Sequence, residues 1–201
     1  MTVIRPRHGD ARQNGRPPDP STPDESAAMP ADDPNDRLLR PLASDAFRDV
    51  IGHFASGVTV ITTTVDGTLH GTTANAVTSL SLEPPMLLIC MRRTSATGRA
   101  VAASGAFAVN ILGDGDDELA RRFAATGGDK FAGVRVAVGD HGQPLLLDAL
   151  AQLVCRVTQT VDAATHVVFF ASVHEATARP GHPLAYYRGK YWRLAFEQPA
   201  Q

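Results

Sequence analysis

Small hydrogen-bonding side chains gather between Gly71 and Pro85, where a predicted strand should end. They are Thr72, Thr73, Asn75, Thr78, Ser79 and Ser81. Small side chains let a flat ligand approach the backbone, whose amide N–H groups can then donate to ring carbonyls or to phosphate. The same residue types also dominate turns for purely local reasons. The segment alone therefore leaves a ligand site and a Ser/Thr-rich turn both open.

A second polar group, Arg92-Arg93-Thr94-Ser95-Ala96-Thr97, lies between a predicted strand and the start of a predicted helix. Free N–H groups, hydroxyls and guanidinium charge meet there, and this combination suits a phosphate. A helix cap flanked by solvated arginines explains the same residues equally well.

Two weaker signals follow further along the chain. Lys130 and Phe131 set a cation beside an aromatic ring, which could border an anion site and a ring system. His166 directly precedes the apolar run 167–170 and should therefore lie at the rim of a barrel. A lone histidine at a rim is more often an ordinary surface residue, although its chemistry is versatile.

Sequence motifs of other common chemistries are absent. The chain has no G-x-G-x-x-G, no P-loop, no G-x-S-x-G and no H-E-x-x-H pattern. Its histidines lack metal-ligand spacing, and Cys90 and Cys155 form no C-x-x-C pair, so no metal site is expected. Any nucleotide cofactor must be held without a Rossmann loop.

Length and charge narrow the class of protein. The chain has 201 residues and a formal net charge of −2, which fits one domain with a substantial core and does not favour a polyanionic partner. No apolar run is long enough to span a membrane, and the N-terminus lacks the apolar segment of a secretory signal. We therefore expect a cytoplasmic protein that binds neither nucleic acid nor membrane.

The prolines divide the chain into two parts. Residues 1–43 hold eight of the fourteen prolines, mixed with charges of both signs and few large apolar residues. Such a segment cannot bury enough surface to offset its ordering entropy. We expect a disordered tail over residues 1–43 and a folded domain over residues 44–198.

The folded part is expected to be mostly β. Ser44 should cap a first helix that carries Phe47, Val50, Ile51 and Phe54 on one stripe and ends before Gly57. Strands are predicted at 58–65, 69–77, 86–91, 107–112, 134–138, 151–161 and 166–176, with short helices at 95–103 and 116–124 and hairpin turns at Asp66-Gly67 and Arg188-Gly189. Strands joined by turns rather than by long helices predict a mostly antiparallel barrel.

These pieces, in this order, resemble the flavin reductase-like family, whose fold is an FMN-binding split barrel. The resemblance covers about residues 45–196. It rests on Phe47-Arg48, Gly52-His53-Phe54-Ala55-Ser56-Gly57, Thr73-Ala74-Asn75, Ser79-Leu80-Ser81-Leu82-Glu83-Pro84-Pro85, Ser95-Ala96-Thr97, Asp129-Lys130-Phe131, His166 and the segment 183–191. It implies an antiparallel split β-barrel with a few short helices.

The resemblance also implies a set of cofactor-binding residues. Those along the isoalloxazine ring and ribityl chain are Thr73, Ala74, Asn75, Ala76, Ser79 and Ser81, with Cys90 beside them on the next strand. Ser95 and Thr97 would hold the phosphate side, and Lys130 and Phe131 would close over it. His166 matches the catalytic histidine that the family places near the nicotinamide.

Two positions depart from the family pattern. Ala76 stands where the family often has serine, which removes one hydrogen bond. The usual Gly-Asp-His triplet reads Ala164-Thr165-His166, so the loop lacks a glycine and a carboxylate. The second change bears on the nicotinamide contact and on the preference between NADH and NADPH.

The function that the resemblance implies is an NAD(P)H-dependent flavin reductase. It would take hydride from NADH or NADPH, reduce FMN or FAD, and supply the reduced flavin to a partner monooxygenase, acting as a homodimer. An oxidase of the related barrel group, using flavin or deazaflavin, and a non-catalytic flavin- or haem-binding protein are the alternatives, because one fold hosts several functions.

Overall fold

A computed structural model describes residues 41–195 of the chain. The chain separates into two units, residues 1–42 and 43–201, and the architecture below is that of the second. The tail predicted over residues 1–43 lies, up to residue 40, outside the described residues. Among the described helices, none is long and apolar enough to cross a membrane.

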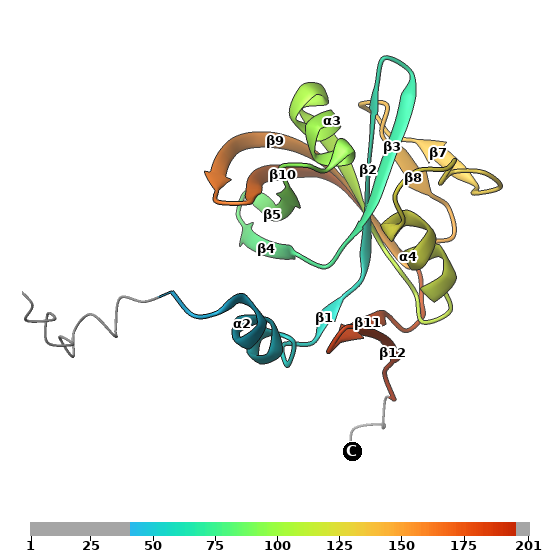
Figure 1. The fold of residues 1–201 in the computed structure, drawn as a ribbon. Coiled ribbons are helices and arrows are strands. Elements are labelled where there is room, and N and C mark those ends of the chain that lie inside the picture. Colours follow the sequence, from blue (N-terminus) through green and yellow to red (C-terminus); the bar gives the residue numbers. More distant parts are fainter. Residues whose placement is uncertain (1–40, 196–201) are drawn as a thin grey trace, which may run out of the picture. The chain divides into compact units, whose positions relative to one another are not determined.

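A seven-stranded antiparallel sheet forms the body of the domain, as the predicted mostly β fold requires (Figure 1). Its strands, in spatial order, are β3 (Thr68–Ala74), β2 (Thr59–Val65), β6 (Ala106–Ile111), β9 (Ala151–Ala163), β10 (His166–Ala178), β5 (Pro85–Arg92) and β4 (Val77–Leu82). The two edge strands, β3 and β4, are consecutive in the chain and separated only by Asn75 and Ala76. The sheet must therefore roll until its edges meet at these two residues. No ladder joins β3 to β4 among the described strands, so the barrel stays open along this seam.

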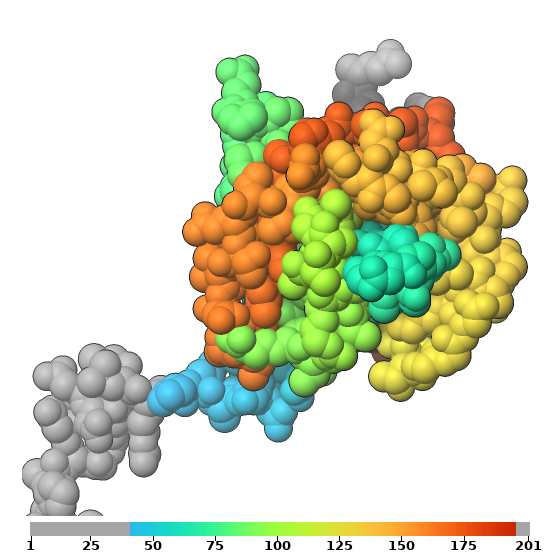
Figure 2. All heavy atoms as spheres, turned by 90° about the horizontal axis from the view of Figure 1, so that it is seen from above, coloured from blue at the N-terminus to red at the C-terminus, as the bar shows by residue number. Residues whose placement is uncertain are grey.

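Smaller elements surround this rolled sheet. A three-stranded sheet contains β1 (Ser56–Gly57), β11 (Leu184–Tyr187) and β12 (Lys190–Arg193), and a two-stranded sheet contains β7 (Val136–Val138) and β8 (Pro144–Leu146). The described helices are α2 (Ser44–Ile51), α3 (Ala96–Ser104) and α4 (Asp117–Ala124). In the space-filling view, α3 lies beside the β2–β3 hairpin (Figure 2).

Turn chemistry explains the two predicted hairpins. The first has Asp66 at φ 49° and Gly67 at φ 75°, and the second has Arg188 at φ 47° and Gly189 at φ 79°. Two successive residues with positive φ form the turn that best matches the twist of antiparallel strands, and Asp-Gly is a favoured pair for it. Both predicted turns are confirmed.

The core is divided between the two faces of β2. Ile61 packs with Ile89, Phe107 and Phe169 in one buried cluster. Val60, the preceding residue, belongs to a second cluster that also contains Val58, Leu112, Phe123 and Leu184. Successive side chains of a strand point to opposite faces, so β2 supplies both clusters and fixes how they sit relative to each other.

Two predicted elements differ from the structure. Helix α2 ends at Ile51 with Gly52 as its C-cap, rather than continuing towards Gly57, and Ser44 is its first residue instead of its cap. The strand predicted at 69–77 stops at Ala74, and a separate strand, β4, follows at Val77–Leu82. The Ser/Thr-rich segment thus forms an edge strand, because its backbone pairs with β5 and offsets the turn preference of its side chains.

Candidate functional site

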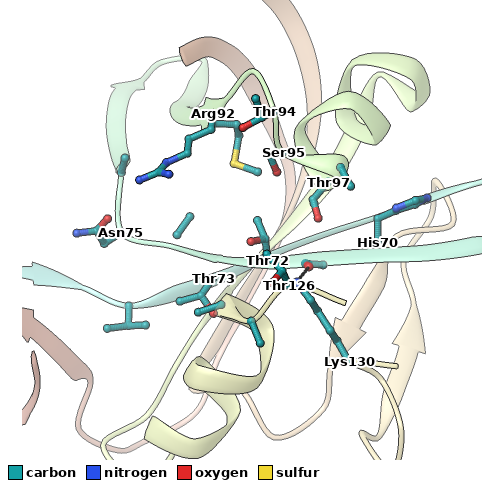
Figure 3. Close-up of a pocket in the computed structure, with 18 of the residues that line it drawn as sticks. His70, Thr72, Thr73, Asn75, Arg92, Thr94, Ser95, Thr97, Thr126 and Lys130 are labelled. Carbon is teal, nitrogen blue, oxygen red and sulfur yellow. Dashed lines mark hydrogen bonds between the residues drawn. The ribbon is translucent and has the colours of Figure 1, made fainter. Parts of the chain in front are cut away.

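A cavity of about 1010 Å³ opens where β3 and β5 end and helix α3 begins. The segment 124–131 after α4 forms its opposite wall, and Tyr186 and Tyr191 of the β11–β12 hairpin complete the lining. Arg92, Thr94 and Ser95 lie on one side of β3, and Lys130 lies on the other (Figure 3). Residues far apart in the sequence thus converge on one hollow.

Helix α3 presents its N-terminus to the cavity. Ser95 is the N-cap, and its Oγ accepts a hydrogen bond of 3.1 Å from the Gly98 N–H. The first N–H groups of a helix have no partner within it and favour an anion. Capping uses only the acceptor side of the Ser95 hydroxyl, so its proton can still be donated to a ligand. The capping interpretation is confirmed, and it leaves the phosphate interpretation open.

The two neighbouring arginines face different ways. Arg92 lines the cavity. Arg93 instead donates from Nε to the Ala164 carbonyl at 3.0 Å and from Nη1 to Asp162 Oδ1 at 2.8 Å. The Arg92 side chain therefore lines the cavity, whereas the Arg93 guanidinium binds the turn between β9 and β10.

Lys130 supplies the positive charge of the opposite wall. Its Nζ donates to the Phe123 carbonyl at 3.0 Å and to the Gly71 carbonyl at 3.3 Å. Desolvation by burial lowers the pKa of Lys130, because a low-dielectric surrounding disfavours the charged form. No carboxylate pairs with Lys130 among residues 41–195. An ammonium with three donors thus retains one for an anionic ligand.

Aromatic packing holds this wall against β3. Phe123 is fully buried, and its ring meets that of Phe131 edge to face with centroids 5.0 Å apart. A Cβ at Gly71 would come within 2.5 Å of Phe123 Cε1 and 3.0 Å of Phe131 Cζ. Only glycine lets the strand lie this close to the two rings.

The end of β3 is already partly hydrogen-bonded within the protein. Thr73 donates from Oγ1 to the Ala120 carbonyl at 2.6 Å, and Asn75 donates from Nδ2 to Ser56 Oγ at 3.3 Å. The Thr73 oxygen and the Asn75 carbonyl remain available as acceptors. These side chains can therefore receive hydrogen bonds from ring N–H or ribityl hydroxyl groups.

His166 occupies the first position of β10 and pairs with Arg92 across the sheet. It lines the cavity, and its Nδ1 lies 2.9 Å from Thr165 Oγ1. Cys90, two residues before Arg92 on the same face of β5, also lines the cavity and is partly buried.

The structure brings together most of the predicted site. The predicted residues that line the cavity are Thr73, Ala74, Asn75, Ala76, Cys90, Ser95, Thr97, Lys130, Phe131 and His166. Ser79 and Ser81 are outside the lining. Ser79 is exposed on β4, and Ser81 Oγ accepts a hydrogen bond of 3.2 Å from the Glu83 N–H. The turn at Asn75–Ala76 carries β4 to the other edge of the sheet, which takes both serines away from β3.

Several lining residues were not assigned to the site from the sequence. They are His70, Thr72, Arg92, Thr94, Thr126, Tyr186 and Tyr191, with the glycines of 127–128. Thr72, Arg92 and Thr94 belong to the polar segments 71–85 and 92–97, so the sequence pointed to these segments without singling out the three residues. Nothing in the sequence indicated that the last hairpin pairs with β1, so no sequence signal pointed to Tyr186 and Tyr191.

The donor set fits an amphipathic ligand with a flat ring and an anionic tail. Hydroxyls, the α3 N-terminus and Arg92 lie on one side of β3, and Lys130 faces them from the other side. Aromatic and small apolar residues line the rest, among them Ala74, Ala76 and Phe131. Polar groups that converge beside apolar surface can fix the orientation of a bound cofactor.

Comparison with known proteins identifies the family. Residues 51–195 match the model of the flavin reductase like domain. The reductase component of a 4-nitrophenol 4-monooxygenase/4-nitrocatechol 2-monooxygenase from Rhodococcus opacus is 47% identical over 154 residues, which are 77% of this chain and 83% of that protein.

Solved structures of flavin reductases and monooxygenase components are similar to this chain in both sequence and fold. Nitrilotriacetate monooxygenase component B from Mycobacterium thermoresistibile is 37% identical with a TM-score of 0.74, over 78% of this chain and 90% of that one. An NADH:FAD oxidoreductase of Streptomyces globisporus, solved in complex with NAD and FAD fragments, is 34% identical with a TM-score of 0.71, over 81% of this chain and 95% of that one. The chain belongs to the flavin reductase like domain family.

Proposed function

We propose that this protein is an NAD(P)H:flavin oxidoreductase that passes reduced FMN or FAD to a partner monooxygenase in the cytoplasm. The observation that carries the proposal is the cavity itself, where the α3 N-terminus and Lys130 frame the end of β3 and His166 stands at the rim. The domain responsible would span residues 44–198. The relatives named as monooxygenase reductase components support the same activity.

The chain supplies binding and orientation in this scheme. A bound flavin supplies the chemistry of accepting a hydride from reduced nicotinamide. Ser95, Thr97 and Lys130 would hold the phosphate, while Thr73 and Asn75 would accept hydrogen bonds from the ring and ribityl chain. Fixing both reactants removes the orientational cost of a bimolecular encounter, so no side chain needs to act as acid, base or nucleophile.

An anaerobic assay tests this proposal. Purified protein mixed with FMN or FAD and NADH without oxygen should bleach the yellow flavin absorbance and oxidise a stoichiometric amount of NADH. The related oxidase alternative predicts a preference for deazaflavin or for an organic substrate over nicotinamide. A binding module predicts retention of flavin without NADH oxidation above background, and that result would refute the reductase.

His166→Ala should raise the KM for NADH about tenfold and leave the Kd of the flavin within about twofold. The reason is that His166 sits at the rim, opposite Arg92, where a nicotinamide approaching the flavin would pass. Steady-state kinetics and flavin fluorescence titration measure the two quantities. His174→Ala, an exposed histidine further along the same strand, is the matched control, and an unchanged KM in His166→Ala would remove the assigned role.

A homodimer is part of the proposal, and helix α2 supports it. Phe47, Val50, Ile51 and Phe54 are each between 50% and 76% exposed, and no residue of the helix is buried. A contiguous exposed apolar stripe marks an interaction surface, and two-fold self-association is the commonest way to cover one. A second cavity of about 730 Å³ between α2 and the start of β4 shares Asn75, Ala76 and Cys90 with the first, so the second copy would adjoin the flavin site.

Phe54→Ser should raise the dimer dissociation constant about tenfold or more, because Phe54 is the most exposed aromatic residue of this stripe and would be a buried anchor in the dimer. Sedimentation velocity over a concentration series measures the constant. Leu147→Ser, which removes an exposed leucine elsewhere, should leave it unchanged. A wild-type chain that sediments as a monomer at every concentration would rule the dimer out.

A further inference from the structure

We infer that Arg93 is a positioning residue for the nicotinamide step, acting through the Ala164-Thr165 turn on the ring of His166. Arg93 is not among the residues that line the cavity, and its side chain bonds to the turn between β9 and β10. The inference rests on the proposed function for the role of His166. The positioning itself rests only on hydrogen bonds that join Arg93, the Ala164-Thr165 turn and His166.

Arg93 holds the β9–β10 turn at three points. Its backbone N–H donates to the Thr165 carbonyl at 3.1 Å, its Nε donates to the Ala164 carbonyl at 3.0 Å, and its Nη1 pairs with Asp162 Oδ1 at 2.8 Å. The ion pair is half exposed and by itself contributes little. The two bonds to backbone carbonyls matter more, because they fix where the turn lies relative to the end of β5.

The turn needs such support. Ala164 has φ 49°, a left-handed conformation that costs energy for a residue with a Cβ and that glycine adopts freely. A strained loop residue persists only where the surrounding structure over-determines it. The Arg93 side chain, which lies outside the β9–β10 hairpin, donates directly to the Ala164 carbonyl and so helps to hold Ala164 in this conformation.

Thr165 transmits the position of the turn to the histidine. Its Oγ1 lies 2.9 Å from His166 Nδ1. Whichever atom donates the proton, this bond fixes the orientation of the ring and leaves Nε2 as the ring nitrogen without a hydrogen-bond partner within residues 41–195. The ring nitrogen of His166 that is left for the cavity is therefore Nε2. In this chain the Thr165 hydroxyl orients the ring, at the position where the family pattern has a carboxylate.

The same loop also links the two halves of the site. Arg93 follows Arg92, which lines the cavity, and is followed by Thr94 and by Ser95, the N-cap of α3. Ser95 is held separately, by the bond from its N–H to the Arg92 carbonyl and by its cap of α3, so loss of the Arg93 side chain should displace the His166 turn and leave the phosphate side in place. Misplacing a positioning group by about 1 Å can cost up to about a hundredfold in rate, so a surface arginine can matter to the reaction without touching it.

The test uses the full chain with two substitutions and their controls. Arg93→Met removes the side-chain donors and keeps an apolar stem, and Thr165→Val removes the hydroxyl at nearly constant shape. Arg156→Met, at an exposed arginine of β9 with no ion pair among the described residues, is the control for the first. Thr165→Ser, which keeps the hydroxyl, is the control for the second.

Kinetics give the first readout. Arg93→Met and Thr165→Val should each raise the KM for NADH about three- to tenfold, while the flavin Kd stays within about twofold and kcat at saturating NADH changes little. Both controls should behave as wild type. A fall in kcat with unchanged KM, or equal effects in Arg93→Met and Arg156→Met, would overturn the inference.

Imidazole nitrogen NMR gives a readout independent of activity. The His166 signals, assigned by their loss in His166→Gln, should shift at Nδ1 in Thr165→Val and in Arg93→Met and stay in place in Thr165→Ser and Arg156→Met. Unmoved signals in Arg93→Met would refute the positioning role. If the wild-type chain oxidised no NADH, the proposed function would fail while these spectra still decided the positioning, so the two failures are distinguishable.

Discussion

Lys130→Met should weaken FMN binding about 30-fold, which corresponds to about 2 kcal/mol. The cavity places the Lys130 ammonium against the wall opposite the α3 N-terminus, with one N–H left over from its bonds to the Gly71 and Phe123 carbonyls. A hydrogen bond to a charged group in a partly desolvated site is stronger than a neutral one. Fluorescence quenching titration measures the loss.

Riboflavin separates a phosphate contact from a structural role. It carries the same ring and ribityl chain as FMN and lacks the phosphate. If Lys130 binds the phosphate, Lys130→Met should leave the riboflavin Kd within about twofold while the FMN Kd rises. Lys190→Met, at the exposed lysine of β12, should change neither. Equal weakening of both ligands would show that the ammonium only braces the wall.

The pH dependence of binding has a defined sign. Burial lowers the pKa of Lys130, so its charge is lost at a lower pH than that of an exposed lysine. The affinity for FMN should therefore fall as the pH rises through this lowered pKa, and riboflavin affinity should not follow it. Because a bound phosphate favours the charged form, binding should also take up protons in this range. A pH-independent ratio of the two affinities would contradict the assignment.

Local rules predicted the parts of this fold that depend on one residue type at one position. Ser95 caps α3, and Asp66-Gly67 turns the first hairpin. In each of these cases a backbone N–H or a positive φ dictates the residue. Such signals lie within a few residues and need no knowledge of the tertiary structure.

The remainder of the site depends on long-range pairing, which no short window contains. Ser79 and Ser81 have the right chemistry for a flavin site, yet pairing of β4 with β5 carries them away from β3. Tyr186 reaches the cavity only because β11 pairs with β1 and returns the last hairpin to the start of the domain. Residue types pointed to the kind of ligand, and strand order decided which of these residues line the cavity.

Gly71→Ala should lower the free energy of unfolding by about 1–3 kcal/mol, because the new methyl group overpacks a buried contact. The added Cβ would lie 2.5 Å from Cε1 and 2.8 Å from Cδ1 of Phe123. That ring is fully buried against Phe131 and cannot swing into solvent. For a domain of this size the loss should reduce the Tm by roughly 2–4 °C per kcal/mol, which differential scanning calorimetry measures.

The same change should also impair the site. Phe123 and Gly71 both offer their carbonyls to Lys130, so pushing the ring off β3 moves the ammonium away from the cavity. FMN affinity should fall together with the Tm. Gly57→Ala is the matched control, since a Cβ there meets nothing within 4 Å and its φ is not in the left-handed region, and it should stay within about 0.5 kcal/mol of wild type.

A compensating substitution tests the cause. Phe123→Leu alone leaves a void and destabilises, yet combined with Gly71→Ala it makes room for the new methyl group. The double variant should therefore be less destabilised than the sum of the two single changes, with a coupling of about 1 kcal/mol, as expected for residues in direct contact. Strict additivity would mean that the ring and the strand do not press on each other. The close approach of β3 to Phe123 could then no longer explain how Lys130 is held in place.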